Sequence, residues 1–458
     1  MSAQRLRAAL ILGPDAVHAD ACLVVEGGIV RGVEPAGHPD ALDLGDVALV
    51  PGLVNAHSHA FQRILRGRTE SLDPARPEED FWTWRDLMYR AALALDGDGV
   101  EVVARMAFAE MARAGITTVG EFHYLHHGPD GADTLADRVV QAARDVGLRI
   151  ALLRVAYHRA GAGRPARPDQ RRFVEPDVAT FLARADALRA RWRDDALVSV
   201  GLAPHSIRAA PGPWIAAIAA HARSENFPLH LHACEQRAEL SEARAEYGVE
   251  PVAALDRLGA LGPGTTLVHA THLEDDALAR IADRGVTVCA CPTTEANLGD
   301  GFLPASALRA AGVPIALGTD SQATVDLFQE ARRVDEHERL LRERRVPFAR
   351  HGLPGPAGRI EVADQLWPMA TTHGGRALGL PVGALAPGAP PTSSRWIWPS
   401  LPSPAPIPRL RGALVFAATP RAVRDVYVAG RPICVAGRHP DEARIVADYR
   451  ALVATFSA

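Results

Sequence analysis

Apolar, β-rich runs recur through the middle of the chain, and stretches with helical periodicity separate them. The helical period is clear in Val100–Ala114 and Thr134–Val146. Eight apolar runs alternating with such helices indicate parallel strands that are buried on both faces. The eight runs are Leu49–Val54, Ile116–Phe122, Arg149–Ala156, Leu197–Ala203, Leu229–Ala233, Thr266–Ala270, Val286–Ala290 and Pro314–Gly318.

A residue that can bind a metal or carry a proton follows nearly every apolar run. In an open, doubly wound sheet, which is the alternative for this pattern, such residues would spread along one edge. In a (β/α)8 barrel they converge on the face where barrel active sites lie. We therefore predict an α/β fold with a (β/α)8 barrel over residues 49–375. The residues in question are His57, His59, Glu121, His123, His158, His205, His232, Glu235, His269, Glu295 and Asp320.

Both ends of the chain show a different pattern, with short β-rich runs and tight turns. Gly27-Gly28 separates two such runs and predicts a hairpin, and residues 424–438 read as a strand, a turn and a strand. We predict one small β-sandwich domain built from residues 1–48 and 376–458. Within it, Gly388–Arg411 is rich in Pro and Ser, which is typical of a flexible surface loop. A pair of compensating frameshifts is a second hypothesis for that segment.

Composition narrows the classes of function. The chain has 458 residues, 48% of them hydrophobic, which is enough for a large core. The net charge is −4 without runs of like charge, so nucleic acid and membrane surfaces are poor candidates as partners. Met1–Pro14 has only a very short apolar segment, and we expect no signal peptide. The five scattered cysteines indicate reduced thiols, and the expected location is the cytoplasm.

Four residues at strand ends form a candidate metal site. His57 and His59 are two residues apart, so they point to the same side of a strand and can chelate one ion. His232 supplies a third nitrogen, whereas His230 lies deeper on the same face and is a weaker candidate. Asp320 supplies a carboxylate. This ligand set predicts one divalent ion, Zn²⁺ with Fe²⁺ as the alternative. A two-metal centre would normally use a carboxylated lysine, and the chain contains no lysine.

Three residues beside this site are the predicted catalytic groups. Glu235, three residues after His232, can take a proton from an attacking water and pass it to a departing nitrogen. His269 can stabilise the charge that develops, with His272 as the alternative. Asp320 can act as ligand and base together. Zinc lowers the pKa of a water that it binds to about 7, which supplies a nucleophile at neutral pH.

The order of these residues resembles the mononuclear deaminase branch of the amidohydrolase superfamily, and further motifs resemble the formimidoylglutamate deiminase family. The resemblance covers residues from about 5 to 385 and resumes near Ala413. It implies a homodimer that deaminates N-formimidoyl-L-glutamate hydrolytically to N-formyl-L-glutamate and ammonia in histidine degradation. The narrower motifs are His57–Arg63, Phe81–Tyr89, Glu121–His127, Ala203–Arg208 and Thr294–Gly301.

The substrate that the resemblance implies carries two carboxylates, and the chain offers matching groups. Arg85 and Arg208 are suited to bidentate binding of a carboxylate. A purine site would not need two guanidinium groups, which argues against the rival function of a nucleobase deaminase or triazine chlorohydrolase. A metal-free barrel scaffold is the non-enzymatic alternative, and the intact ligand set argues against it. Hydrogen bonds to the substrate are predicted from Gln62, Tyr124, His205 and Ser321.

Overall fold

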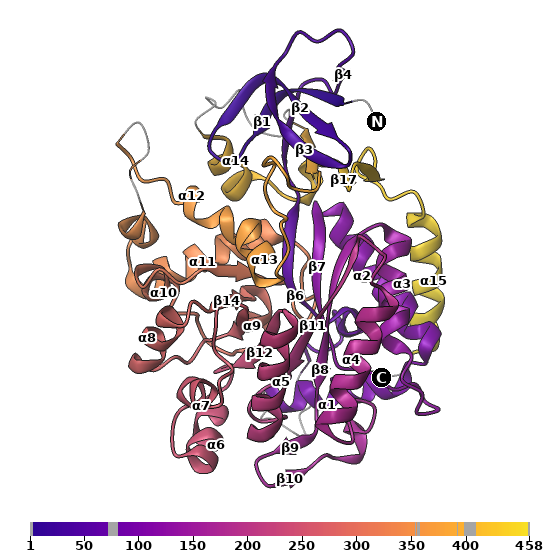
Figure 1. Ribbon diagram of the computed structural model, residues 1–458, viewed down its shortest axis with the longest axis vertical. Coiled ribbons are helices and arrows are strands. Elements are labelled where there is room, and N and C mark those ends of the chain that lie inside the picture. The colour runs from indigo at the N-terminus through magenta and orange to yellow at the C-terminus, as the bar shows by residue number, and fades with distance from the viewer. Residues whose placement is uncertain are drawn as a thin grey trace.

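The computed structural model of the chain describes residues 3–71, 81–352, 354, 358–391, 393–397 and 409–456. Figure 1 shows two parts: a barrel of strands surrounded by helices, and a β-sheet above it that combines both ends of the chain. None of the helices within these ranges is long and apolar enough to cross a membrane.

Eight parallel strands form the barrel, in sequence order around its wall. The last strand returns to the first, because Ser58, the final residue of the first strand, forms a parallel bridge with Asp320, which lies just beyond the last strand. The predicted (β/α)8 barrel is confirmed. Its strands are β6 (Leu53–Ser58), β7 (Ile116–His123), β8 (Arg149–Ala156), β11 (Val198–Pro204), β12 (Leu229–Ala233), β13 (Thr265–His269), β14 (Thr287–Ala290) and β15 (Ile315–Leu317).

Helices connect the strands and cover the outside of the barrel (Figure 1). The two helices predicted from periodicity are α2 (Gly97–Arg113) and α3 (Leu135–Val146). The Asp96 side chain caps α2 by accepting a hydrogen bond from the Gly99 N–H at 2.8 Å. The other helices are α1 (Phe81–Ala94), α4 (Val178–Arg191), α5 (Gly212–Glu225), α6 (Arg237–Tyr247), α7 (Pro251–Arg257), α8 (Asp275–Asp283), α9 (Pro292–Leu298), α10 (Ala305–Ala310), α11 (Leu327–Arg342), α12 (Ala363–Leu366), α13 (Thr372–Ala377), α14 (Leu410–Ala417) and α15 (Glu442–Thr455).

The apolar run Leu49–Val54, expected to be a single strand, is divided between the two parts. Its first half lies in β5 (Val47–Pro51), which pairs with β1 and β16, whereas β6 pairs with β7 of the barrel. Gly52 stands at the division, where a Cβ atom would lie 2.2 Å from the Thr117 hydroxyl oxygen. The prediction of one strand was wrong because both halves are buried, and burial pattern alone cannot reveal the break.

Strands from both chain ends form a single hydrogen-bonded network with β5. The predicted hairpin at Gly27-Gly28 is confirmed: both residues have positive φ, as a tight turn between paired strands requires. The strand order is β18-β17-β16-β5-β1-β2-β3, and β4 also pairs with β1. The bounds are β1 (Gln4–Leu12), β2 (Val17–Glu26), β3 (Ile29–Pro35), β4 (Leu42–Asp43), β16 (Ser393–Ile397), β17 (Val423–Val428) and β18 (Arg431–Cys434).

The Pro- and Ser-rich segment Gly388–Arg411 contains β16, an inner strand of this sheet. Ser393–Ile397 pairs antiparallel with β5 on one side and with β17 on the other. The loop interpretation was therefore wrong for these five residues, because two neighbouring strands offer their backbone groups to any segment that can extend between them. Residues 392 and 398–408 lie outside the described residues. The final helix, α15, packs against α2 of the barrel (Figure 1).

Candidate active site

The seam where the barrel closes brings the predicted metal ligands together. Asp320 donates its backbone N–H to the His57 carbonyl at 3.0 Å, and His59 donates its own to the Asp320 carbonyl at 2.9 Å. Asn55 also connects the first and last strands of the barrel. Its side chain accepts a hydrogen bond from the Thr319 N–H at 3.0 Å and donates one to the Thr319 hydroxyl at 2.7 Å. Backbone pairing thus places the carboxylate of Asp320 beside the two imidazoles.

Three imidazole nitrogens and one carboxylate oxygen lie close together at this seam, as a metal site requires. The His57 Nε2 atom lies 3.2 Å from both His59 Nε2 and His232 Nε2. The Asp320 Oδ1 atom lies 3.5 Å from His57 Nε2 and 3.2 Å from His59 Nε2. Nitrogen ligands at about 2.0 to 2.1 Å from a tetrahedral ion are roughly 3.4 Å apart. The observed distances match that arrangement.

The protonation of the rings also fits a metal. His59 Nδ1 lies 2.9 Å from the Phe122 carbonyl and His232 Nδ1 lies 3.2 Å from the His205 carbonyl. A carbonyl can only accept, so each Nδ1 carries a proton and each Nε2 presents a bare lone pair. Burial lowers the pKa of His57 to about 3 and that of His232 well below its usual value. Neutral rings with converging lone pairs are the donor set that a divalent cation requires.

His269 lies beside this site with carboxylates at both ring nitrogens. Its Nε2 atom is 3.6 Å from Glu235 Oε1 and 3.8 Å from Asp320 Oδ2, and its Nδ1 atom is 3.4 Å from Glu295 Oε1. Burial alone would lower the pKa of His269, but these carboxylates together raise it well above the ordinary value. These surroundings favour the protonated ring, which is suited to stabilising negative charge that develops nearby.

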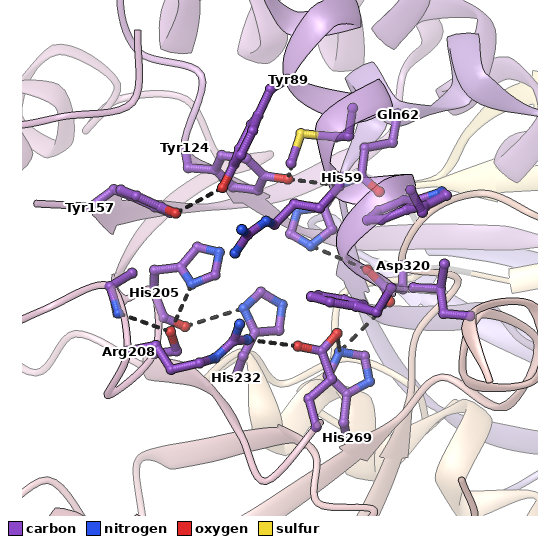
Figure 2. A pocket seen from close by; sticks show the side chains of 18 of the residues that line it. His59, Gln62, Tyr89, Tyr124, Tyr157, His205, Arg208, His232, His269 and Asp320 are labelled. Atoms are coloured by element: carbon purple, nitrogen blue, oxygen red, sulfur yellow. Dashed lines mark hydrogen bonds and ion pairs between the residues drawn. The ribbon is translucent and has the colours of Figure 1, made fainter. Parts of the chain in front are cut away.

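Polar side chains from several barrel elements complete the pocket. Figure 2 shows Tyr89, Tyr124 and Tyr157 along one wall, with His269 and Asp320 across from them. Gln62 donates from Nε2 to the Tyr124 hydroxyl at 2.6 Å, and the Tyr89 and Tyr157 hydroxyls are 3.0 Å apart. The residues lining the pocket include the predicted His59, Gln62, Arg85, Tyr124, His205, Arg208, His232, Glu235, His269 and Asp320.

Two arginines face the same pocket from different elements. The Arg85 guanidinium, on α1, lies over the Trp82 ring with 4.4 Å between its central carbon and the ring centroid. Among the described residues, no carboxylate forms an ion pair with Arg85. Arg208 is buried, and it donates from Nη2 to Glu235 Oε2 at 3.0 Å and from Nε to Glu239 Oε2 at 3.3 Å. The pocket therefore offers two positive groups a short way from the metal ligands.

Comparison with known proteins agrees with this geometry. The model of the Amidohydrolase family matches residues 48–433. The chain belongs to the amidohydrolase family. It is 37% identical over 425 residues to a formimidoylglutamate deiminase of Pseudomonas aeruginosa, with 91% of each chain covered.

Two solved structures share the fold of this amidohydrolase. An amidohydrolase from Brucella melitensis is 30% identical, with a TM-score of 0.90 and coverage of 98% of this chain and 99% of that one. An adenosine deaminase from Xanthomonas campestris with bound zinc is 27% identical, with a TM-score of 0.81 and coverage of 99% of both chains. Membership of a family of metal-dependent hydrolases fits the ligand set found at the seam.

Three predicted or alternative residues of this amidohydrolase lie elsewhere. Ser321 does not line the pocket: its hydroxyl faces Thr294 Oγ1 at 3.1 Å, because the left-handed backbone of Asp320 (φ 46°) turns the chain toward α9. The weaker ligand candidate His230 donates from Nε2 to the Ala377 carbonyl at 2.7 Å, deep in the barrel. His272 is outside the pocket as well. Direct substrate contact from Ser321 is therefore not supported.

Several residues that the predicted site omitted are part of it. Glu295 follows a barrel strand, so the strand-end pattern marked it, yet its contact with His269 depends on the turn into α9. Glu239 lies in the first turn of α6, seven positions after His232, and nothing in that spacing pairs it with Arg208. Burial, and then the nearby carboxylate of Glu235, raises the pKa of Asp300 to about 9. A buried acid in a loop has no signature in sequence.

Proposed function

We propose that this amidohydrolase hydrolyses N-formimidoyl-L-glutamate to N-formyl-L-glutamate and ammonia. The observation that carries the proposal is the meeting of three histidines and the nearby carboxylate of Asp320 with two arginines, Arg85 and Arg208, at one pocket. Among the described residues, Arg85 has no carboxylate partner, whereas Arg208 is paired with Glu235 and Glu239. A substrate carboxylate would neutralise Arg85 and compete for Arg208, and a nucleobase would do neither. The Pseudomonas aeruginosa relative, named formimidoylglutamate deiminase, supports the same substrate.

Zn²⁺ is the proposed ion at His57, His59, His232 and Asp320, with Fe²⁺ as the alternative. Three imidazoles and one nearby carboxylate suit zinc, and the Xanthomonas campestris relative was solved with zinc bound. When bound, such an ion lowers the pKa of a coordinated water and thereby supplies a nucleophile at neutral pH.

The side chains then carry the protons of a hydrolytic deamination. Glu235 accepts the proton of the attacking water as its oxygen bonds to the formimidoyl carbon. The imidazolium of His269 donates from Nε2 toward the charge that develops at that carbon's substituents. Asp320 is the second proton acceptor. Burial alone would raise its pKa, but contacts with His57 and His59 lower it, so its carboxylate is ionised and can take up a proton. Glu235 returns its proton to the nitrogen of the initially cationic formimidoyl group. Asp320 takes the proton of the new hydroxyl group as the carbon–nitrogen bond breaks, and the ammonia leaves with this second proton as ammonium.

The far end of the pocket holds the glutamate portion. Arg85 and Arg208 bind its two carboxylates, and the predicted hydrogen bonds come from Gln62, Tyr124 and His205. Burial raises the pKa of Tyr124 well above its ordinary value, so its hydroxyl stays neutral and can donate. This division puts the reacting carbon at the metal and the charged portion of the substrate at the arginines.

Ammonia release from purified, zinc-loaded protein tests the proposal. Release from N-formimidoyl-L-glutamate, with N-formyl-L-glutamate as the second product, is expected, whereas guanine, cytosine and adenosine should yield none. Release from a nucleobase or nucleoside alone would overturn the substrate. The homodimer, the cytoplasmic location and the place in histidine degradation belong to the same proposal, and light scattering tests the dimer.

A further inference from the structure

Arg208 contacts two carboxylates, of which only Glu235 lines the pocket; the other is Glu239. Its Nη2 atom donates to Glu235 Oε2 at 3.0 Å, and its Nε atom donates to Glu239 Oε2 at 3.3 Å. Glu235 is the proposed proton carrier, and Arg208 is a proposed ligand of the substrate. The guanidinium that is proposed to bind the substrate therefore also contacts the carboxylate that is proposed to transfer the proton.

Glu239 holds this guanidinium and does not line the pocket. Its side chain is fully buried, and both oxygens are engaged: Oε1 accepts from the Cys234 N–H at 2.9 Å, and Oε2 accepts from Arg208. Cys234 follows β12 directly, so Glu239 ties Arg208 to the end of a barrel strand. The rings of Phe81 and Trp82 lie 5.8 and 5.7 Å from the guanidinium carbon and limit its movement.

The contact between Arg208 and Glu235 opposes the proton transfer that Glu235 performs. The hydrogen bond from Arg208 occupies Oε2, one of the two oxygens through which Glu235 can exchange a proton. Glu235 also directs its other oxygen, Oε1, toward His269 Nε2 at 3.6 Å, so both of its oxygens face positive groups. A carboxylate that competes for Arg208 would reduce this restraint.

On the basis of the proposed function, we propose that Arg208 couples recognition of the substrate carboxylate to catalysis. The carboxylate takes over the Nη2 hydrogen bond of Arg208 and releases Glu235, while Glu239 acts as a positioning residue that keeps the guanidinium in place during the exchange. A small amidine without a carboxylate leaves Glu235 paired with Arg208. Such a substrate is turned over slowly even when it saturates the enzyme.

The test uses two small molecules that together carry the functional groups of the substrate. N-Methylformamidine supplies the reacting group and glutarate supplies the carboxylates. With zinc-loaded wild-type protein, saturating glutarate should raise the kcat of ammonia release from N-methylformamidine about tenfold, the effect of one charge-assisted hydrogen bond. Absence of stimulation, or inhibition by glutarate, would overturn the coupling.

Variants of Glu239 test the positioning. Glu239→Gln cannot accept from both the Cys234 N–H and Arg208, so the glutarate concentration for half-maximal stimulation should rise about tenfold. The KM for N-formimidoyl-L-glutamate should rise in parallel, with kcat changed by less than about twofold, and Glu239→Asp should recover part of the loss. A fall in kcat with unchanged KM would contradict the positioning.

A matched control lies on the same helix. Glu242 forms an ion pair with Arg164 at the surface of α6, so Glu242→Gln should leave the stimulation and the KM unchanged. Zinc content and circular dichroism of each variant separate a folding defect from a defect in positioning. If Glu239→Gln does not fold, Arg208→Lys takes its place, because a single ammonium cannot reproduce the fork between two carboxylates and should abolish the stimulation.

The coupling and the proposed function fail in different ways. If wild-type protein releases ammonia from N-formimidoyl-L-glutamate but glutarate does not stimulate N-methylformamidine hydrolysis, only the coupling is wrong. If neither amidine yields ammonia, the proposed function is wrong and the coupling falls with it.

Discussion

The metal half and the substrate half of the pocket are held in place by different means. Backbone hydrogen bonds position the metal half, because its residues stand at the ends of parallel strands and the seam at Ser58 and Asp320 aligns them. Side-chain contacts position the substrate half, including ring stacking for Arg85 and ion pairs for Arg208. The two halves follow the proposed function: the metal half is His57, His59, His232 and Asp320, and the substrate half is Gln62, Arg85, Tyr124, His205 and Arg208.

This difference shows which half can change during evolution. A ligand set fixed by strand register changes only if the barrel changes, whereas loops and helices around it can exchange side chains freely. The zinc-bound adenosine deaminase from Xanthomonas campestris shares the fold over nearly its whole length, and its name gives a different substrate. We therefore expect the two halves to respond differently to substitution.

Loss of a metal ligand should have the largest effect. His57→Ala removes the imidazole that lies 3.2 Å from both other imidazole nitrogens, and ammonia release should fall about 10⁴-fold or more for every amidine, because the metal contributes several kcal/mol. Metal analysis of the variant should show loss of the bound ion. Full metal content with unchanged activity would contradict the assignment of the metal half.

Substitution in the substrate half should affect binding and spare the metal. Arg85→Met removes a charged partner of one carboxylate, and the KM for N-formimidoyl-L-glutamate should rise about 10- to 100-fold. Metal content should stay unchanged, and so should the kinetics with N-methylformamidine, which has no carboxylate. Equal losses with both amidines would erase the distinction between the halves.

Glu295 tests the support of the catalytic residues. Glu295→Gln keeps an oxygen for the Cys291 N–H but removes the negative charge beside His269 Nδ1, so kcat should fall about tenfold or more. Because Glu235, Glu295 and Asp320 together raise the pKa of His269, the variant's ring loses its proton at lower pH. The alkaline limb of its kcat profile should move to lower pH; an unmoved limb would argue against this role.

Glu121 should have the smallest effect, and on stability rather than rate. It accepts from the Ser58 hydroxyl at 2.6 Å and from the Ala60 N–H at 2.7 Å, and burial raises its pKa from 4.5 to about 7. The folded state therefore binds a proton that the unfolded state releases between these pH values. From pH 5 to 8, the free energy of unfolding should fall by about 2 kcal/mol relative to Glu121→Gln. Urea unfolding at each pH measures the free energy of unfolding. A constant difference between wild type and Glu121→Gln from pH 5 to 8 would contradict the prediction.

Much of the metal half was predictable because its signals are local. A histidine pair after the first apolar run, and an aspartate after the eighth, can be assigned to strand ends from the neighbouring residues alone. The substrate half was predictable only through resemblance to a family. The contacts of Glu239 with Arg208, and of Tyr89 with Tyr157, join segments whose separation in sequence carries no periodic signal.

The sequence by itself determined the alternation of strands and helices, the strand ends and therefore the residues of the metal half, since these depend on short-range periodicity. Tertiary structure alone decided the rest. It divided Leu49–Val54 between two sheets, made Ser393–Ile397 an inner strand, and turned Ser321 away from the pocket. In each case the outcome depends on hydrogen-bonding partners distant in sequence, and local pattern does not identify such partners.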